Sequence, residues 1–156
     1  MNNEEFARRV ESIRVKLYKT AILYLGSESQ AQDALDETVY KALCGYHKLR
    51  RPEYFDTWIT RILINECHNL LRHQKRETPV ETLPETEAEA LDTLPLKEAI
   101  RCLPEELKEV VILRYFSGLT LQETAQLLKI PQGTAVTRQR KALKLLRLEL
   151  EEEGEA

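Results

Sequence analysis

Between Pro131 and Leu148 the sequence carries five cations and no acid. At 100° per residue, most of these cations fall on one side of a helix with two threonines, whereas Ala135, Ala142 and Leu146 fall opposite. Arginine can pair with guanine through two hydrogen bonds, and lysine and threonine can hold phosphates. A charged helix face is usually only solvated, but the absence of acids here favours contact with DNA. The candidate DNA-contacting residues are Thr134, Thr137, Arg138, Arg140, Lys141 and Lys144.

A shorter helix is expected directly before this one. Thr120 and Glu123 form a T-x-x-E capping box, in which each side chain satisfies a backbone N–H of the first turn. Ile130 and Pro131 end the shorter helix, and the proline suits the first turn of the next. The apolar positions of the shorter helix repeat at i, i+4 and i+7 and are Leu121, Ala125 and Leu128. The two helices together predict a helix-turn-helix, whose second helix enters the major groove of DNA.

The elements that position this unit are also expected to be helices, because no strand-like alternation occurs in the sequence. Apolar residues have helical spacing in three longer segments, which are 4–25, 27–43 and 55–74, with Gly26 as the stop of the first. Shorter helices are expected over 95–103 and 104–116. The predicted fold is therefore all-α, with two small helical domains and an acidic flexible linker between them. The predicted boundaries are a first domain at 1–74, a linker at 75–94, a helix-turn-helix domain at 95–150 and an acidic tail at 151–156.

Charge is unevenly distributed along the 156 residues, although the formal net charge is only −3. Eight cations and three acids lie between Lys41 and Arg76, whereas six acids and no cation lie between Glu77 and Leu94. Two basic segments separated by an acidic one suggest two contact surfaces for a polyanion. In the first segment, aromatic residues alternate with cations, which suits single-stranded nucleic acid because bases stack on rings. For Phe55 and Trp58 taken singly, packing into a small core is an equally good interpretation.

Other classes of function have little support in the sequence. No nucleophile–base pair or phosphate-binding glycine loop is present, so we expect neither an enzyme nor a small-molecule substrate. Cys44, Cys67 and Cys102 lack a C-x-x-C pair, so no metal or other cofactor is expected and buried free thiols are the default. No secretory signal or membrane-spanning run occurs, which predicts a cytoplasmic protein.

With these motifs in place, the chain resembles the extracytoplasmic-function (ECF) group of bacterial sigma factors, the smallest members of the sigma-70 family. In the first half, the resemblance lies in LYKTAILYLGSESQAQDALDETVYKAL and FDTWITRILINECHNLLR. In the second half, it lies in LPEELKEVVILRYFSGLTLQETAQLLKIPQGTAVTRQRKAL. The resemblance implies transcription initiation at specific promoters, with core RNA polymerase, promoter DNA and an anti-sigma factor as partners.

The resemblance also implies three sites. The helix from Pro131 to about Leu148 would read the minus-35 element through the residues given above. The second helix would bind core polymerase through Asp33, Ala34, Asp36, Glu37, Thr38 and Lys41. The connector at 45–54 and the third helix would recognise the minus-10 element through Arg50, Arg51, Tyr54, Phe55, Thr57, Trp58, Arg61, Asn65 and Asn69. Val136 and Gln139 depart from the family pattern, which often has a basic residue and an apolar one at these positions. By its angular position Gln139 falls near the buried face, where its side chain can form a hydrogen bond instead.

Two alternatives make different predictions. A free-standing helix-turn-helix regulator that dimerises through its N-terminal helices should bind an operator alone, whereas a sigma factor should act only with core polymerase. A helical adaptor that binds only protein should keep its function when Arg140 and Lys141 are changed to alanine.

Overall fold

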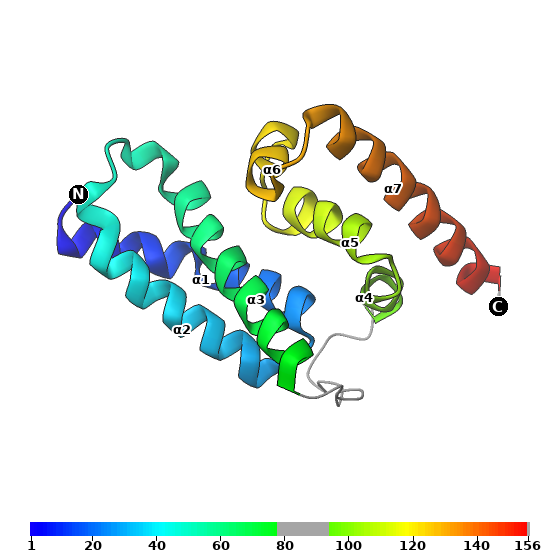
Figure 1. Cartoon of the computed structure of the whole chain (residues 1–156), viewed down its shortest axis with the longest axis horizontal. Coiled ribbons are helices and arrows are strands. Elements are labelled where there is room, and N and C mark those ends of the chain that lie inside the picture. The colour runs from blue at the N-terminus through cyan, green and yellow to red at the C-terminus, as the bar shows by residue number, and fades with distance from the viewer. Residues whose placement is uncertain (78–93, 156) are drawn as a thin grey trace. The chain divides into compact units, whose positions relative to one another are not determined.

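The computed structural model describes residues 1–77 and 94–155, and all regular structure in these ranges is helical (Figure 1). The chain divides into two compact units, Met1–Glu85 and Thr86–Ala156. The prediction of an all-α fold with two helical regions is confirmed. Most of the predicted linker lies outside the described residues. Its first three residues belong to a helix, because the third long helix continues to Glu77 rather than ending at residue 74.

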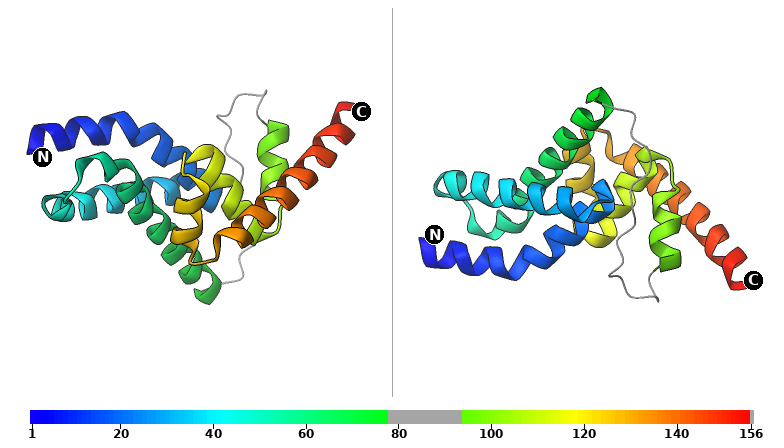
Figure 2. Two further views of the ribbon diagram at one scale, coloured as in Figure 1. Left: turned by 90° about the horizontal axis from the view of Figure 1, so that it is seen from above. Right: turned by 90° about the horizontal axis from the view of Figure 1, so that it is seen from below.

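In unit 1, residues 1–77 form three long helices and a connector. The helices are α1 (Asn3–Leu25), α2 (Glu28–Gly45) and α3 (Phe55–Glu77), and each packs against the other two (Figure 2). Two short 3-10 turns, η1 (Tyr46–Lys48) and η2 (Pro52–Tyr54), form most of the connector between α2 and α3. The connector is therefore a short structured segment with both ends fixed to long helices.

The turn between α1 and α2 contains the predicted stop at Gly26. Gly26 has a φ of 69° and donates its N–H to the carbonyl of Ile22, which closes α1 in the left-handed conformation that glycine favours. Ser27 then accepts a hydrogen bond from the backbone N–H of Gln30 at 3.2 Å, which caps the start of α2.

The core of unit 1 is formed by one face of each helix. The α2 face consists mostly of small side chains, and small residues let neighbouring helices approach closely. Three threonines of the described residues are also buried here, Thr20, Thr38 and Thr60. The buried apolar side chains include Phe6, Val10, Ile13, Leu17 and Ala21 of α1, Ala31, Ala34, Leu35 and Ala42 of α2, and Phe55, Ile59, Leu63, Ile64 and Cys67 of α3.

The described part of unit 2 contains four α-helices and a π-helical turn. They are α4 (Leu94–Arg101), α5 (Glu105–Val111), the π turn η4 (Ile112–Phe116), α6 (Leu121–Leu128) and α7 (Gln132–Glu155). The long α7 contacts α4, α5 and α6 (Figure 2). Its first half therefore completes a helix-turn-helix with α6, and α4 and α5 provide the platform against which α7 packs.

The turn from α6 to α7 has the expected start and a different end. The capping box is present, because Thr120 and Glu123 each accept a hydrogen bond from the other's backbone N–H. We expected Ile130 and Pro131 to end α6, but the helix ends at Leu128 and Lys129 adopts a left-handed φ of 60°. The helix beginning at Gln132 extends to Glu155, so the predicted acidic tail is helical over 151–155.

The three cysteines differ in their surroundings. Cys67 is buried as expected, and its burial raises the pKa of the thiol from 9.0 to about 12, with a further contribution from the charge of Glu66. Cys44 and Cys102 are exposed, so the expectation of burial was wrong for these two. Within the described residues, no three potential metal ligands lie together, and no helix has the length and apolarity needed to cross a bilayer.

Candidate nucleic-acid and polymerase interfaces

The outer face of α7 carries the predicted DNA-contacting residues. Thr137, Arg140, Lys141 and Lys144 are exposed, and Thr134 is half-buried. Thr137 donates its hydroxyl to the carbonyl of Gly133 at 3.1 Å, a local bond that still leaves oxygen lone pairs for another donor. The opposite face packs into unit 2 through Ala135, Ala142 and Leu146. The helix thus has the two-sided character that its sequence predicted.

Arg138 lies at the border of this face. Its Nη2 atom is 3.8 Å from Oε2 of Glu106 in α5, and its side chain is 26% exposed. An ion pair between partly exposed groups stabilises a fold only weakly, by about 0–1 kcal/mol. Its main effect here is to direct the Arg138 side chain toward α5.

Gln139 faces inward, as its angular position suggested. Its Oε1 atom accepts a hydrogen bond from Nε of Arg114 at 3.0 Å, and Nη1 of the same arginine donates to the carbonyl of Leu119 at 2.7 Å. Arg114 comes from the π turn, so one guanidinium joins that turn, the segment before α6, and α7. The sequence interpretation anticipated a hydrogen bond from Gln139 but missed Arg114, because the contact spans 25 positions.

The predicted minus-10 residues lie on the connector and along α3. Exposed and half-buried side chains are interspersed along α3, whereas those on the connector are all exposed. Exposed members are Arg50, Arg51, Tyr54, Arg61 and Asn65, and half-buried members are Thr57, Trp58 and Asn69. Cations and aromatic rings are therefore both available at the surface of the connector and the first turns of α3, as single-strand binding requires.

Phe55 requires a correction. It was assigned to the minus-10 surface, but its exposed fraction is 0%. Its ring meets Phe6 edge-on at 5.9 Å and Trp58 at 5.8 Å between centroids. The core interpretation is correct for Phe55, whereas Trp58 stays partly accessible beside it.

The predicted polymerase-binding set on α2 divides between surface and core. Asp33, Asp36 and Glu37 are exposed on one side. Ala34 and Thr38 were assigned to the same surface, but they are 1% and 0% exposed, and Thr38 donates its hydroxyl to the Ala34 carbonyl at 2.7 Å. These two residues pack between helices instead, because they share the spacing of the buried face.

Lys41 is exposed and is bound to a neighbouring helix. Its Nζ donates to Oε1 of Glu66, a largely buried carboxylate in α3. The hydrogen bond to Glu66 raises the pKa of Lys41, so the lysine stays charged at neutral pH. Its most immediate function is to neutralise Glu66.

Two apolar side chains beside the acidic residues of α2 were missed from the sequence. Tyr40 is 61% exposed and Leu43 is 49% exposed. Tyr40 lies one turn after Asp36 and Leu43 about two turns after it, so the exposed side of α2 combines acids with apolar surface. The available signal was their position off the buried stripe of this amphipathic helix.

Comparison with known families gives two matches, in the order of the two units. The family described as "Sigma-70 region 2" matches residues 9–77, and "Sigma-70, region 4" matches residues 99–148. The first match covers α2, the connector and α3, and the second covers the helix-turn-helix. All three candidate surfaces therefore lie within matched regions.

Two curated proteins from Bacillus subtilis (strain 168) are similar over most of the chain. RNA polymerase sigma factor SigV is 32% identical over 141 residues, which covers 87% of this chain and 85% of SigV. The ECF RNA polymerase sigma factor SigW is 25% identical over 169 residues, covering 96% of this chain and 90% of SigW. Both similarities include the two units.

Solved structures agree on the fold. The sigma factor RpoE from Bartonella quintana, solved with the anti-sigma factor NepR, has a TM-score of 0.82 at 22% identity and covers 95% of this chain and 98% of that one. CnrH, solved with the cytosolic domain of CnrY, has a TM-score of 0.74 at 22% identity over 96% and 90% of the two chains.

Proposed function

The chain belongs to the ECF group of the sigma-70 family and is an RNA polymerase sigma factor, and we propose how its surfaces divide that function. The observation that carries the proposal is the ordered pair of family matches, each of which contains a surface suited to its task. A free-standing repressor would account for the second match but not for the first.

The outer face of α7 is proposed to read the minus-35 element. Its support is the exposed set of Thr137, Arg140, Lys141 and Lys144, with Thr134 and Arg138 at the margins. Among the described residues, no acid forms an ion pair with Arg140, Lys141 or Lys144, so these charges can meet phosphates and base edges. Each base-specific contact is expected to contribute about 1–3 kcal/mol of discrimination.

The connector and the exposed side of α3 are proposed to bind the unpaired minus-10 strand. Arg50 and Arg51 would hold phosphates, and Tyr54 and Trp58 would stack on exposed bases. The surface of α3 would extend the site through Arg61, Asn65 and Asn69. Phe55 would act only from the core, by supporting the position of Trp58.

The exposed side of α2 is proposed to bind core polymerase. Asp33, Asp36 and Glu37 supply charge for a basic partner surface, and Tyr40 and Leu43 supply apolar contact area. Interfaces of this kind place apolar residues at the centre and charges at the rim. Much of the affinity for promoters would then come from polymerase, which holds both DNA-binding units at high local concentration.

Further parts of the proposal concern the cellular setting. We expect a cytoplasmic protein without enzymatic activity of its own, and an anti-sigma factor as a regulatory partner. The support for the partner is that the similar sigma factor from Bartonella quintana was solved with one. Co-purification of the chain from cells, followed by identification of bound proteins, would test this expectation.

Run-off transcription with core polymerase and a library of genomic fragments tests the main proposal. Selective initiation above core alone is expected, and none should occur without core. Glu37→Arg should weaken binding to core, whereas Glu11→Arg on α1 is the matched control at another exposed acid. Lys141→Ala should weaken promoter use while core binding stays unchanged. Operator binding by the isolated chain as a dimer would contradict the proposal.

A further inference from the structure

The N-terminal end of α1 holds both ends of the connector. Asn3, Phe6 and Arg9 lie three residues apart and therefore share one side of the helix. The first two contact Tyr46 at the start of the connector. Arg9 contacts Pro52 near its end, and both Phe6 and Arg9 contact Phe55, the first residue of α3. None of the three belongs to the proposed DNA-binding residues.

At the start of the connector, Tyr46 is almost fully buried against α1. Its ring stacks on Phe6 with 4.5 Å between centroids and 20° between planes, and its hydroxyl donates to Oδ1 of Asn3. The backbone N–H of Leu49 then bonds to the Tyr46 carbonyl at 3.1 Å, which closes the first turn.

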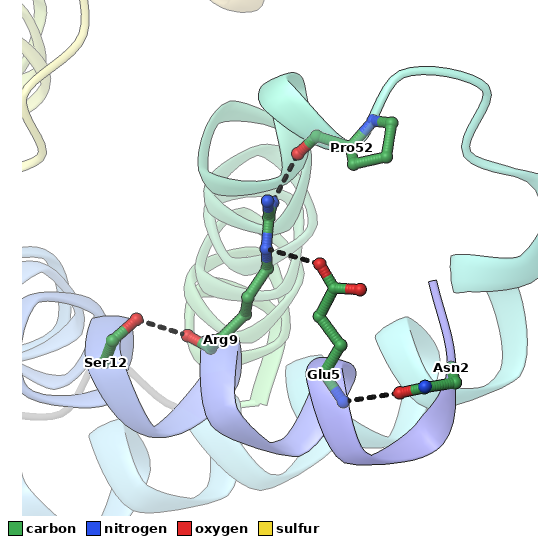
Figure 3. A network of polar contacts seen from close by, with 5 residues as sticks. All are labelled: Asn2, Glu5, Arg9, Ser12 and Pro52. Carbon is green, nitrogen blue, oxygen red and sulfur yellow. Dashed lines mark hydrogen bonds and ion pairs between the residues drawn. The ribbon is translucent and has the colours of Figure 1, made fainter.

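At the end of the connector, Arg9 binds the backbone itself. Its Nη1 donates to the carbonyl of Pro52 (Figure 3). Its guanidinium carbon is 5.6 Å from the centroid of the Phe55 ring. Glu5 lies 3.8 Å from Nε of the same arginine. Proline has no N–H, so its carbonyl is the only backbone hydrogen-bonding group at this position.

The start of α1 is itself fixed in place. The side chain of Asn2 caps the helix by accepting from the N–H of Glu5 at 2.8 Å, and Ser12 donates to the carbonyl of Arg9 at 2.8 Å (Figure 3). The cap holds the first helical turn, which carries Asn3 and Phe6, in helical geometry.

Between the two attachments, Arg50 and Arg51 are exposed, and Tyr54 follows directly after Pro52 and Glu53. We propose that Asn3, Phe6 and Arg9 form a connector clamp, and that Arg9 is a positioning residue for the minus-10 site. The clamp holds the connector in the one shape that fits the preferred bases, whereas a released connector can rearrange to fit other bases as well. This inference rests on the proposed role of the connector.

Arg9→Met tests the inference because it keeps an unbranched apolar stem and removes the donor and the charge. Arg8→Met is the matched control, since it removes an equal charge from an exposed neighbour and no described contact joins Arg8 to the connector. Arg9→Lys restores the charge but not the planar group that spans Pro52 and Phe55.

The measurement uses holoenzyme assembled from core and each variant, on a promoter recovered by run-off selection. The minus-10 element of this promoter is randomised, and the non-template strand is left unpaired over that element. Initiation is compared between templates that carry the preferred base and templates that carry a substituted one. Arg9→Met is expected to reduce the ratio of the two about five- to twentyfold, because a loosely held connector discriminates less. Arg9→Lys should recover part of this ratio, and Arg8→Met should match the unmodified chain.

The outcomes separate the inference from the function on which it rests. The clamp is overturned if Arg9→Met leaves the base preference unchanged. This includes the case in which Arg9→Met weakens initiation equally on all templates. If Arg9→Met does not fold, Tyr46→Phe decides, since it removes only the bond to Asn3 and should lower the preference in the same direction. If Arg50→Ala, Arg51→Ala and Tyr54→Ala all leave minus-10 use unchanged, the proposed function of the connector fails instead.

Discussion

Arg114 donates a hydrogen bond to the side chain of Gln139 at 3.0 Å and so fixes α7 to the π turn of unit 2. The same guanidinium binds the carbonyl of Leu119 at 2.7 Å and lies 5.5 Å from the centroid of the Tyr115 ring. Single-turn π elements often occur at functional positions in helices. Here the π turn brings one arginine against the inner side of the proposed DNA-reading helix.

Removing the acceptor should therefore destabilise unit 2. Gln139→Leu leaves a partly buried guanidinium without one of its partners, and the free energy of unfolding is expected to fall by about 1–3 kcal/mol. Denaturant unfolding would measure the loss, with Gln122→Leu as the control at an exposed glutamine. Combining Gln139→Leu with Arg114→Met in a double-mutant cycle should give a clear coupling energy. Additive effects would mean that the hydrogen bond contributes nothing.

The contribution of the outer face of α7 to DNA binding should be measurable from the salt dependence of promoter binding. Arg140→Ala and Lys141→Ala should each weaken promoter binding by holoenzyme, and loss of a phosphate contact should lower the slope of log K against log salt by about one. Fluorescence anisotropy across a salt series would give the slope. Arg101→Ala on α4 removes an exposed cation that pairs with Glu98, and its slope should stay unchanged. Equal slopes in all three variants would contradict the assignment.

The capping box at the start of α6 should contribute measurably to stability. Thr120→Ala removes the oxygen that accepts the N–H of Glu123 at 3.1 Å, and the expected cost is about 0.5–2 kcal/mol. Thr120→Ser keeps the hydroxyl and should retain most of the stability. Thermal unfolding of the two variants would distinguish loss of the cap from loss of the methyl group, since the latter would affect both equally.

Burial of Cys67 predicts a dependence on pH. The pKa of its thiol is about 12 in the folded chain and 9.0 as an ordinary value, so the folded state keeps the proton. The unfolded chain releases that proton first as the pH rises, and the resulting loss of stability should begin near 9 and grow toward 12. Unfolding measured from pH 7 to 10 should show the onset of this loss.

Thiol labelling provides an independent measurement. Cys44 and Cys102 are exposed and should react rapidly with a thiol reagent at pH 8, whereas Cys67 should react only on unfolding. A variant with Cys44→Ser and Cys102→Ser isolates the slow thiol. Rapid labelling of that variant in native conditions would contradict the burial of Cys67.

Short-range signals explain why much of the fold could be predicted from the sequence. The box formed by Thr120 and Glu123 and the stop at Gly26 depend on neighbours a few positions away, and the structure contains both. The inward faces of α1, α2 and α7 also follow from spacing alone. Spacing equally indicated burial of Ala34 and Thr38, and family resemblance was a poorer guide than periodicity at these two positions.

Contacts between distant positions account for most of what was missed. Three such contacts join separate elements. They are the hydrogen bond from Arg114 to Gln139, the hydrogen bond from Arg9 to Pro52, and the ion pair of Lys41 with Glu66. Nothing in the local sequence of Arg9 distinguishes it from Arg8 beside it. Such pairings depend on how helices pack, and a single sequence contains no direct record of that packing.

Each unit buries its own apolar side chains, and the matched regions end at residue 77 and begin again at residue 99. A genetic crossover between codons 78 and 93 would therefore exchange one whole unit without dividing a described helix. Preferences for the upstream and downstream promoter elements could then be inherited separately. New combinations of the two preferences could arise by recombination as well as by point mutation.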